Sequence, residues 1–394
     1  MLSYVTAGES HGESLVGIIT GFPAGVKISV DKINAALSLR QNGYGRGKRM
    51  SIEKDTVKIL SGIRCGYTLG SPITLQIKNK DYENWKPITN PICIRDKELY
   101  EKKMVLCPRP GHADLFGGIK YRHLCDLRNV LERSSARETA IRTAIGNLCR
   151  QFLENFGIEF YAFVVQIGEI VLPSALETDY NKLLKQYEKA DDYKIRILDK
   201  EFEESVIEYI DIIREKKDTI GGKIRLLIKN VPIGLGTYTH WEEKLDARLA
   251  YTLMSIQAVK EVQFGIGIEQ TLIGSNYHDE IFYDKKAKRF YHKTNRCGGI
   301  IGGMSNGEII DIKITMKPIP TLMMPLKTVD LKTKESVEAV KERSDVCALT
   351  ALSVIVENIS AYEIMRAFLL KFGHDNLQEI KNNYESYLEY LKSI

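Results

Sequence analysis

The pattern of apolar and polar positions predicts short strands near the N-terminus and a helix directly after them. Residues 14–30, SLVGIITGFPAGVKISV, hold two apolar runs around a Gly-Phe-Pro-Ala-Gly segment, which predicts two strands joined by a turn. The segment that continues from this stretch, VDKINAALSLRQ, predicts a short helix with Asp31 as its N-cap and Gly43 at its end.

Further along the chain, apolar residues recur at helical spacing. Residues 126–156 predict one long helix that ends at Gly157, and residues 218–262 predict a strand followed by a helix. Glycine-rich turns and strands are expected over 265–316, and a final helical region from about 335. Because strands and helices do not alternate regularly, the pattern indicates an α+β fold rather than a doubly wound parallel sheet.

In two segments the apolar residues recur with no clear helical or strand period. Residues 79–122 predict a long ordered loop that carries PRPGHAD, and loops of that length in compact domains are usually functional. Residues 175–217 are rich in lysine and glutamate and only weakly amphipathic, so we expect a solvated helical insertion there. The chain is expected to form a single domain over 1–394, with this insertion and a C-terminal helix at about 376–394.

Composition and charge exclude several classes of protein. Hydrophobic residues make up 44% of the chain and charged residues 27%, which is ordinary for a globular protein. No apolar run approaches the roughly 18 residues of a membrane-spanning helix, so we expect a cytoplasmic protein with no membrane partner. The seven cysteines form no C-x-x-C pair, so neither a disulfide framework nor a metal site is expected.

Arginines recur beside glycine or serine in four separate places. A guanidinium presents a planar fork to a carboxylate or phosphate, and small neighbours let backbone N–H groups approach the same oxygens. Each arginine alone is better explained by a surface ion pair, but four such clusters together indicate an anion site. The arginines in question are Arg40, Arg46, Arg49, Arg109, Arg133, Arg137 and Arg343.

Two glycine-rich segments fail to match nucleotide-binding motifs. In GYGRGK, Lys48 is followed by Arg49 rather than by serine or threonine, which excludes a P-loop. In GIGIEQ, Gln270 stands where the dinucleotide fingerprint needs its third glycine. The net charge of +5 does not by itself indicate nucleic acid. An RNA-binding protein that uses the loop around Arg46 as a phosphate clamp stays as an alternative hypothesis from another class.

Two histidines stand in polar loops beside glycine: His11 in GESHG and His112 in RPGHAD. Because an imidazole titrates near neutral pH, either can donate or accept a proton. Ser10 adjoins His11, but neighbours in an extended segment point to opposite faces, which argues against a serine nucleophile. Glu9 is expected to face away from any bound anion and to orient an arginine or the loop backbone.

Seven segments, in order along the chain, closely resemble the chorismate synthase family over residues 1 to about 372. They are GESHG, RQNGYGRGKRM, PRPGHADLFGGIKY, ERSSARETAIRTAIG, GGMSNGE, KPIPTL and RSDVCAL. The resemblance implies a β-α-β sandwich, with a helical core layer between two antiparallel sheets, and usually a homotetramer. It also implies anti-1,4-elimination of phosphate and the C6 proton from 5-enolpyruvylshikimate 3-phosphate. The product, chorismate, completes the last common step of the shikimate pathway to aromatic amino acids.

The resemblance gives the arginine clusters a reason, since the substrate carries two carboxylates and a phosphate. Several cations are needed to gather these anions in a partly dry site. It implies that the substrate anions are bound by Arg40, Arg46, Arg109, Arg137 and Arg343, with hydrogen bonds from Ser10 and Ser134. It further implies that His11 assists phosphate departure, that His112 stabilises the reduced flavin, and that Asp345 helps the flavin N5 accept the C6 proton.

The cofactor implied by the resemblance is reduced FMN. The positions that match the family's flavin contacts are Arg133, Ser134, Ser135, Gln257, Ala258, Gly302, Lys317, Pro318, Ile319, Pro320, Thr321 and Arg343. Some members reduce their flavin with NADPH, in which case Arg40 and Arg46 would bind NADP, and others use an external flavin reductase. The sequence leaves both sources of reducing equivalents open.

Overall fold

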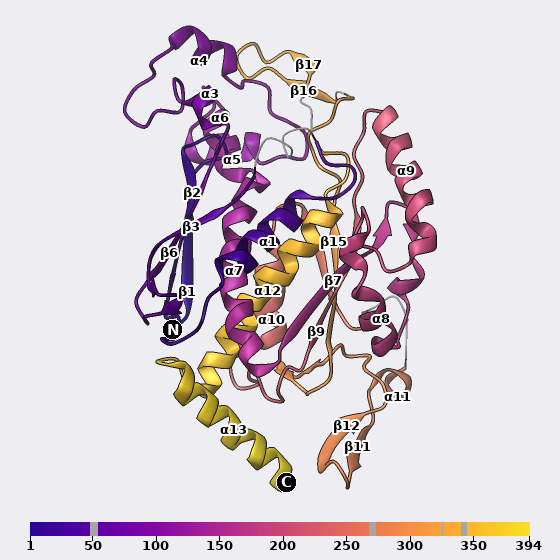
Figure 1. Cartoon of the computed structure of the whole chain (residues 1–394). Coiled ribbons are helices and arrows are strands. Elements are labelled where there is room, and N and C mark those ends of the chain that lie inside the picture. The colour runs from indigo at the N-terminus through magenta and orange to yellow at the C-terminus, as the bar shows by residue number, and fades with distance from the viewer. Residues whose placement is uncertain (48–53, 268–272, 325, 340–344) are drawn as a thin grey trace.

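Alternating apolar positions in the first eighty residues build a four-stranded antiparallel sheet in the computed structural model, which describes residues 1–47, 54–267, 273–324, 326–339 and 345–394 (Figure 1). Its strand order is β1-β2-β6-β3. The bounds are Ser3–Ala7 (β1), Ser14–Thr20 (β2), Val57–Ser61 (β3) and Ile73–Lys78 (β6). Leu15, Ile19 and Leu75 are buried on the inner face, as the period of two requires.

A second, five-stranded antiparallel sheet has the order β10-β15-β9-β7-β8. Its strands are β7 (Glu159–Ile167), β8 (Ile170–Val171), β9 (Gly222–Lys229), β10 (Val259–Phe264) and β15 (Ile310–Met316). In β7, Phe160 and Val164 join the main core, whereas Phe163 and Val165 join a second cluster on the opposite face. Both faces of this sheet are therefore covered, which explains its nearly continuous apolar runs.

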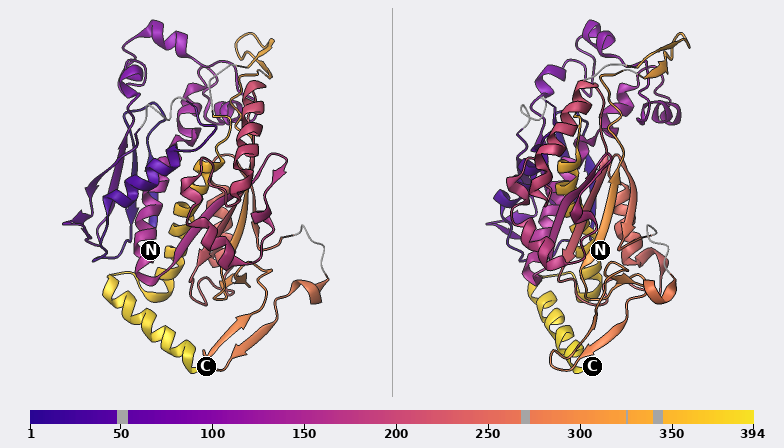
Figure 2. Two further views of the ribbon diagram at one scale, coloured as in Figure 1. Left: turned by 45° about the vertical axis from the view of Figure 1, so that its right-hand side comes forward. Right: turned by 90° about the vertical axis from the view of Figure 1, so that its right-hand side faces the viewer.

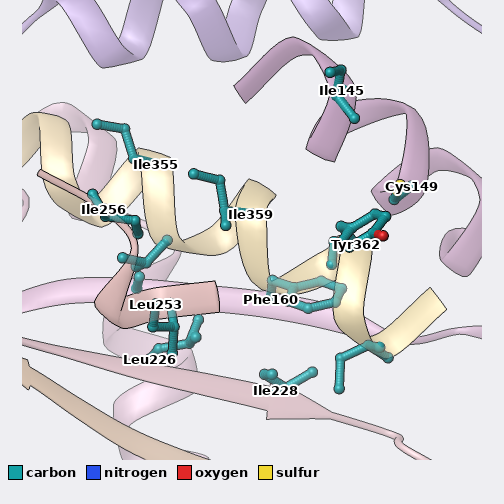
Figure 3. Packing of buried hydrophobic residues seen from close by; sticks show 14 of the residues in the cluster. Ile145, Cys149, Phe160, Leu226, Ile228, Leu253, Ile256, Ile355, Ile359 and Tyr362 are labelled. Carbon is teal, nitrogen blue, oxygen red and sulfur yellow. The ribbon is translucent and has the colours of Figure 1, made fainter. Parts of the chain in front are cut away.

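Helices lie between the two sheets (Figure 1). They are α1 (Val30–Gln41), α7 (Thr139–Leu153), α10 (Leu245–Met254) and α12 (Leu349–Phe372). Helix α12 is buried on all sides, as a helix without a polar face must be. Figure 3 shows Ile355 and Ile359 of α12 with Ile145 of α7 on one side and Leu226 and Ile228 of β9 on the other.

Helices α7 and α12 approach closely at Gly146. A Cβ on this residue would lie 2.1 Å from the Asn358 carbonyl oxygen, so only glycine allows the observed separation. Beside this point, Asn147 Nδ2 donates to Asn358 Oδ1 at 3.1 Å, and Gln151 Nε2 donates to Asn147 Oδ1 at 3.0 Å. This polar contact fixes how the two central helices are positioned along each other.

The prediction of one long helix over 126–156 is wrong in one respect, because two helices occupy this range. Helix α6 (Arg128–Ser134) ends before α7 begins, and the extended Ser135 and a 3₁₀ turn, Ala136–Glu138, lie between them. Ser135 Oγ accepts a hydrogen bond from the Arg137 N–H at 3.3 Å and caps the turn. Serine side chains compete in this way with helical hydrogen bonds. The expected stop at Gly157 is confirmed by its φ of 70°.

Other boundaries also differ from the predictions. The N-cap of α1 is Ser29, which accepts from the Lys32 N–H, and Asp31 lies in the first turn instead. The second strand predicted before α1 is reduced to a single bridge between Lys27 and Tyr67. The helix predicted within 218–262 ends at Met254, because the chain turns there into β10.

Short helices occupy the loop predicted over 79–122, and short strands surround the remaining turns. The helices are α3 (Tyr82–Trp85), α4 (Lys97–Lys103) and α5 (Asp114–Tyr121). The minor elements are β4 (Ile63–Arg64), β5 (Tyr67–Thr68), α11 (Gly274–Tyr277), β11 (Ile281–Asp284), β12 (Arg289–His292), β13 (Ile300–Ile301), β14 (Met304–Ser305), β16 (Lys327–Val329) and β17 (Ser336–Glu338). The final helical region begins at Leu349 rather than near 335, because β17 precedes it.

The segment 175–217 is helical, as expected, but several of its apolar side chains are buried, so it is not a fully solvated segment. It contains α8 (Tyr180–Tyr187) and α9 (Glu203–Glu215). Leu183 and Leu198 are buried in the cluster that covers the outer face of β7, and Ile210 of α9 is buried in the main core. The few apolar residues among the charges were too widely spaced to reveal this covering role.

Helix α13 (Leu377–Ser393) and the β11–β12 hairpin extend from the same end of the molecule (Figure 2). Helix α13 has one fully buried side chain, Ile380, and packs aromatic rings such as Tyr384 against Phe368 of α12. In the described part of the chain, no helix is long and apolar enough to cross a membrane.

Gly146→Ala should lower the free energy of unfolding by about 3 kcal/mol, because the new methyl group forces α7 and α12 apart. Urea denaturation measures this change. Gly274→Ala is the matched control, since the nearest atoms to its Cβ belong to the His278 side chain at 3.7 Å. The control should change stability by less than about 0.5 kcal/mol. Equal stability of the two variants would contradict the close approach at Gly146.

Candidate active site

Two buried arginines share one carboxylate beside the helical layer. Arg40 lies in the last turn of α1, and Arg137 lies in the turn that precedes α7. Arg137 Nη1 donates to Asp55 Oδ2 at 2.6 Å, and Arg40 Nη1 lies 3.6 Å from the same oxygen. Arg40 Nε also donates to Thr139 Oγ1 at 3.1 Å. The cluster therefore has two guanidinium charges and one carboxylate charge.

The surplus positive charge is evident at Arg40. Burial, together with the neighbouring charges of Arg137 and Arg46, lowers its pKa to about 9 against the opposing effects of Asp55 and Asp345. Within the described residues, Arg40 Nη1 forms no hydrogen bond. A buried cation with a donor that lacks an acceptor is a site that an anion would stabilise.

The glycine-rich loop after α1 places Arg46 against Asp345. Arg46 Nη1 lies 2.9 Å from Asp345 Oδ2, and the Gly47 N–H donates to Asp345 Oδ1 at 2.6 Å. The side chain of Arg46 is only 10% exposed, which does not favour the RNA-clamp hypothesis. Arg49 and Arg343, two arginines of the predicted anion clusters, lie outside the described residues.

His11 is held by a carboxylate that sequence analysis did not select. Its Nδ1 lies 2.9 Å from both oxygens of Glu132, and its backbone N–H donates to Glu132 Oε2 at 2.8 Å. The ring also packs on Trp85, with 4.2 Å between centroids. Burial alone would raise the pKa of Glu132, but hydrogen bonds from His11 and the charge of Arg128 lower it. Glu132 is therefore ionised at neutral pH.

Asn79 connects the His11 loop to the arginine pair. Its Nδ2 donates to the carbonyl oxygens of Glu9 and Gly12 at 3.1 and 2.8 Å, and its Oδ1 accepts from Arg137 Nε at 3.0 Å. The Glu9 carboxylate lies against its own loop, 3.0 Å from where a Cβ on Gly12 would be. Among the described residues Glu9 forms no ion pair with an arginine, and the expectation that it faces away from a bound anion stays a prediction.

His112 and Arg109 share a second carboxylate, Asp114. His112 Nδ1 lies 2.5 Å from Asp114 Oδ1, and Arg109 Nε donates to Asp114 Oδ2 at 2.9 Å. Burial alone would raise the pKa of Asp114, but hydrogen bonds from His112 and Arg109 lower it to about 2. Arg109 Nη1 also donates to Thr321 Oγ1 at 3.3 Å, which joins this loop to the segment Lys317–Thr321.

The predicted flavin positions form a connected set around these loops. The Lys317 N–H donates to the Ala258 carbonyl oxygen at 3.0 Å, and the Lys317 ammonium donates to the Gly111 carbonyl oxygen. Gln257 Nε2 donates to Glu138 Oε2 at 3.4 Å. Glu138 Oε1 in turn accepts from Thr6 Oγ1 at 2.9 Å, and Thr6 is the residue that Arg133 contacts.

Some predicted residues lie apart from this set or act only locally. Gly302 lies in the turn between β13 and β14, and no described contact connects it to Gln257 or Lys317. Ser134 Oγ donates to the Leu131 carbonyl oxygen at 3.4 Å, and Ser10 is buried beside Glu132. Pro318, Ile319 and Pro320 follow Lys317, and the Ile319 carbonyl oxygen accepts from Thr219 Oγ1 at 2.7 Å.

The carboxylates of the site escaped sequence analysis to different degrees. Asp114 stands two residues after His112 in PRPGHAD, and Glu132 stands directly before Arg133, so both had a local signal. Asp55 and Asn79 lie in stretches with no motif, and only the folded chain brings them to Arg137.

Comparison with known proteins identifies the family of the chain. The family model described as chorismate synthase matches residues 2–369. The chain belongs to the chorismate synthase family. The resemblance inferred from seven motifs is thus confirmed, and the protein is an enzyme, a lyase that eliminates phosphate.

Named relatives cover essentially the whole chain. Chorismate synthase of Alkaliphilus metalliredigens is 52% identical over 388 residues, which are 98% of this chain and 99% of the relative. Chorismate synthase of Geobacter metallireducens is 49% identical, with both chains fully covered. A crystal structure of chorismate synthase superimposes with a TM-score of 0.80 at 37% identity, covering 100% of this chain and 99% of that one.

Asp114→Asn should lower the free energy of unfolding by about 2 kcal/mol at pH 7, because the lowered folded-state pKa stabilises the native protein. This stabilisation is complete above the unfolded pKa, near 4, and is lost as the pH falls toward 2. The difference from wild type should thus shrink to roughly half by pH 3.

Urea unfolding at pH 7, 5 and 3 measures this difference. Glu385→Gln, which removes an exposed carboxylate of α13, is the control and should change stability by less than about 0.5 kcal/mol at each pH. A difference for Asp114→Asn that stays constant down to pH 3 would show that the carboxylate charge does not stabilise the fold.

Proposed function

We propose that the protein converts 5-enolpyruvylshikimate 3-phosphate to chorismate by anti-1,4-elimination of phosphate and the C6 proton. One observation carries the proposal: two buried arginines, Arg40 and Arg137, share the single carboxylate of Asp55. The resulting surplus of positive charge suits a substrate with two carboxylates and a phosphate. Two histidines are each held by their own carboxylate, and Asn79 links the His11 loop to this cluster.

The substrate anions are assigned to Arg40, Arg46, Arg109, Arg137 and Arg343, with Ser10 and Ser134 as hydrogen-bond donors. The described arginines of this set lie on separate elements of the chain and are mostly buried, which supports binding of several anionic groups at different positions. A guanidinium fixes the orientation of a carboxylate or phosphate as well as its charge. The role of these residues is therefore both to bind and to orient.

His11 is assigned to the departing phosphate. Because a carboxylate only accepts hydrogen bonds, the contact with ionised Glu132 keeps a proton on His11 Nδ1. It leaves Nε2 as the atom that donates a proton to the leaving group. Only the doubly protonated ring carries a proton on Nε2, so this form of His11 is the acid in the proposal.

His112 and Asp345 are assigned to the other side of the reaction. Asp114 accepts a hydrogen bond from His112 Nδ1 and fixes the ring, and Arg109 Nη2 lies 3.2 Å from His112 Nε2, so both groups position His112 to stabilise the reduced cofactor. Asp345, fixed by the Gly47 N–H and paired with Arg46, assists removal of the C6 proton.

The residues present fit a flavin mononucleotide. Gln257 Oε1 is buried and accepts no hydrogen bond from the described residues, so it is free to accept from a ring N–H. Lys317 and Arg133 are cations suited to a phosphate, and a Cβ on Gly302 would meet no atom closer than 4.0 Å. When bound, reduced FMN supplies electron density that weakens the C–O bond to the departing phosphate. The reducing equivalents come from NADPH, with Arg40 and Arg46 binding it, or from an external flavin reductase.

We also infer the family's architecture and assembly. The contacts of α7 with β2 and β6, and of α12 with β7 and β9, support a single-domain β-α-β sandwich over 1–394. On this view the segment 175–217 is an insertion and α13 a C-terminal addition, and the chains assemble as a homotetramer in the cytoplasm.

An anaerobic assay tests the proposed function. Protein, reduced FMN and 5-enolpyruvylshikimate 3-phosphate should yield chorismate and inorganic phosphate in equal amounts, whereas oxidised FMN alone should yield neither. Absence of product with reduced FMN would refute the proposal. Repeating the assay with NADPH and oxidised FMN in place of reduced FMN shows whether the protein reduces its own flavin.

His112→Ala should lower turnover by about one to two orders of magnitude, as is typical when a positioned acid or base is removed, while substrate binding is largely retained. Steady-state kinetics with reduced FMN measures both. His374→Ala, which removes an exposed histidine after α12, is the control and should leave turnover unchanged. Full turnover of His112→Ala would remove this residue from the reaction.

A further inference from the structure

The loop that carries Arg46 contains glycines that leave its backbone conformation weakly determined. It leaves α1 at Asn42 and includes Gly43 and Gly45, whose φ angles are 117° and 86°. Glycine makes such angles accessible but also makes the loop conformationally free in the absence of other contacts. The position of the Arg46 guanidinium thus depends on the contacts that this loop makes with the rest of the chain.

Backbone hydrogen bonds attach the loop to two distant segments. The Tyr44 N–H donates to the Lys194 carbonyl oxygen at 2.8 Å, and the Val346 N–H donates to the Gly45 carbonyl oxygen at 2.8 Å. The Ile220 N–H donates to the Val346 carbonyl oxygen at 2.9 Å. Lys194 and the chain after α9 therefore contact Tyr44 and Val346, which lie close in sequence to Arg46 and Asp345.

A side-chain hydrogen bond also joins this loop to α9. Tyr44 Oη donates to the carboxylate of Asp211 on α9, at 2.8 Å from Oδ1 and 2.7 Å from Oδ2. Arg214, one turn further along α9, pairs with Asp211, and its guanidinium carbon lies 5.0 Å from the centre of the Tyr44 ring. The tyrosine is held by a charged hydrogen bond at its tip and a cation over its face.

Packing limits the loop on its inner side. A Cβ on Gly45 would lie 3.0 Å from Cys347 Cβ and 3.4 Å from Ile210 Cγ2. Ile210 is fully buried and directly precedes Asp211 on α9. Helix α9 thus sets the depth of the loop through Ile210 and its lateral position through Asp211.

We propose that Tyr44 and Asp211 are positioning residues for the substrate-binding loop, so that α9 of the segment 175–217 sets the affinity for the substrate anions through Arg46. The proposal rests on the proposed function of Arg46. Without the Tyr44–Asp211 bond the loop samples more conformations, and binding must then select the competent one, which weakens apparent affinity. His11 and His112 lie on other loops. The bonds of Asp345 to Gly47 and Arg46 form again once bound substrate has selected the competent loop conformation, so turnover at saturation depends less on this contact.

Tyr44→Phe and Asp211→Asn test the proposal, since each removes part of the hydrogen bond with little change in volume. Each should raise the KM for 5-enolpyruvylshikimate 3-phosphate about three- to tenfold, with kcat changed less than twofold. The double variant should show no further increase, because both substitutions remove one interaction. Asp211→Glu, which keeps a carboxylate, should recover part of the loss.

Two reference variants distinguish the possible failures. Glu208→Gln removes an exposed carboxylate of α9 that has no contact with the loop, and its KM should equal that of wild type. Arg46→Ala should raise KM in the same assay. Absence of wild-type turnover would refute the proposed function itself. With wild type active and Arg46→Ala impaired, an unchanged KM in Tyr44→Phe, or a lowered melting temperature alone, would overturn the positioning role.

Discussion

The sharing of the Asp55 carboxylate by two buried guanidiniums is the constraint on which the site depends. Burying a charge is costly unless an opposite charge accompanies it, and one carboxylate cannot compensate Arg40 and Arg137 together. Burial is the main reason that the pKa of Arg40 is lowered, and the charge of Arg137 adds to this effect. An anion that binds in the site compensates the second guanidinium charge. Binding therefore relieves an electrostatic cost that the folded protein carries without the anion.

The helical layer makes this arrangement possible because it delivers both arginines from rigid elements. Arg40 comes from the end of α1, and Arg137 from the turn at the beginning of α7. The break at Ser135 is essential here, because in one continuous helix the side chain of Arg137 would not be directed toward Asp55. Gly146 in turn allows α12 to lie close enough to support α7 at this position.

Local patterns in the sequence predict most of the helices and strands but not their interruptions. The four arginine-containing motifs and the two histidines were found because their chemistry is concentrated in short segments. Asp55 and Asn79 could not be found in the same way, since their partner Arg137 is distant in sequence and no local spacing identifies it. The covering role of 175–217 was missed because a few buried side chains, such as Leu183 and Ile210, carry it among many charges.

The contact between Gly47 and Asp345 joins residues that are 298 positions apart. During synthesis from the N-terminus, the first sheet and α1 can pair and pack while the ribosome is still translating the second sheet. The Arg46 loop, in contrast, has no access to its acidic partner until residue 345 of 394 has emerged. A chain that ends before residue 345 lacks this partner and also the buried helix α12, so the anion site and the packing between the two sheets depend on the same late part of the sequence.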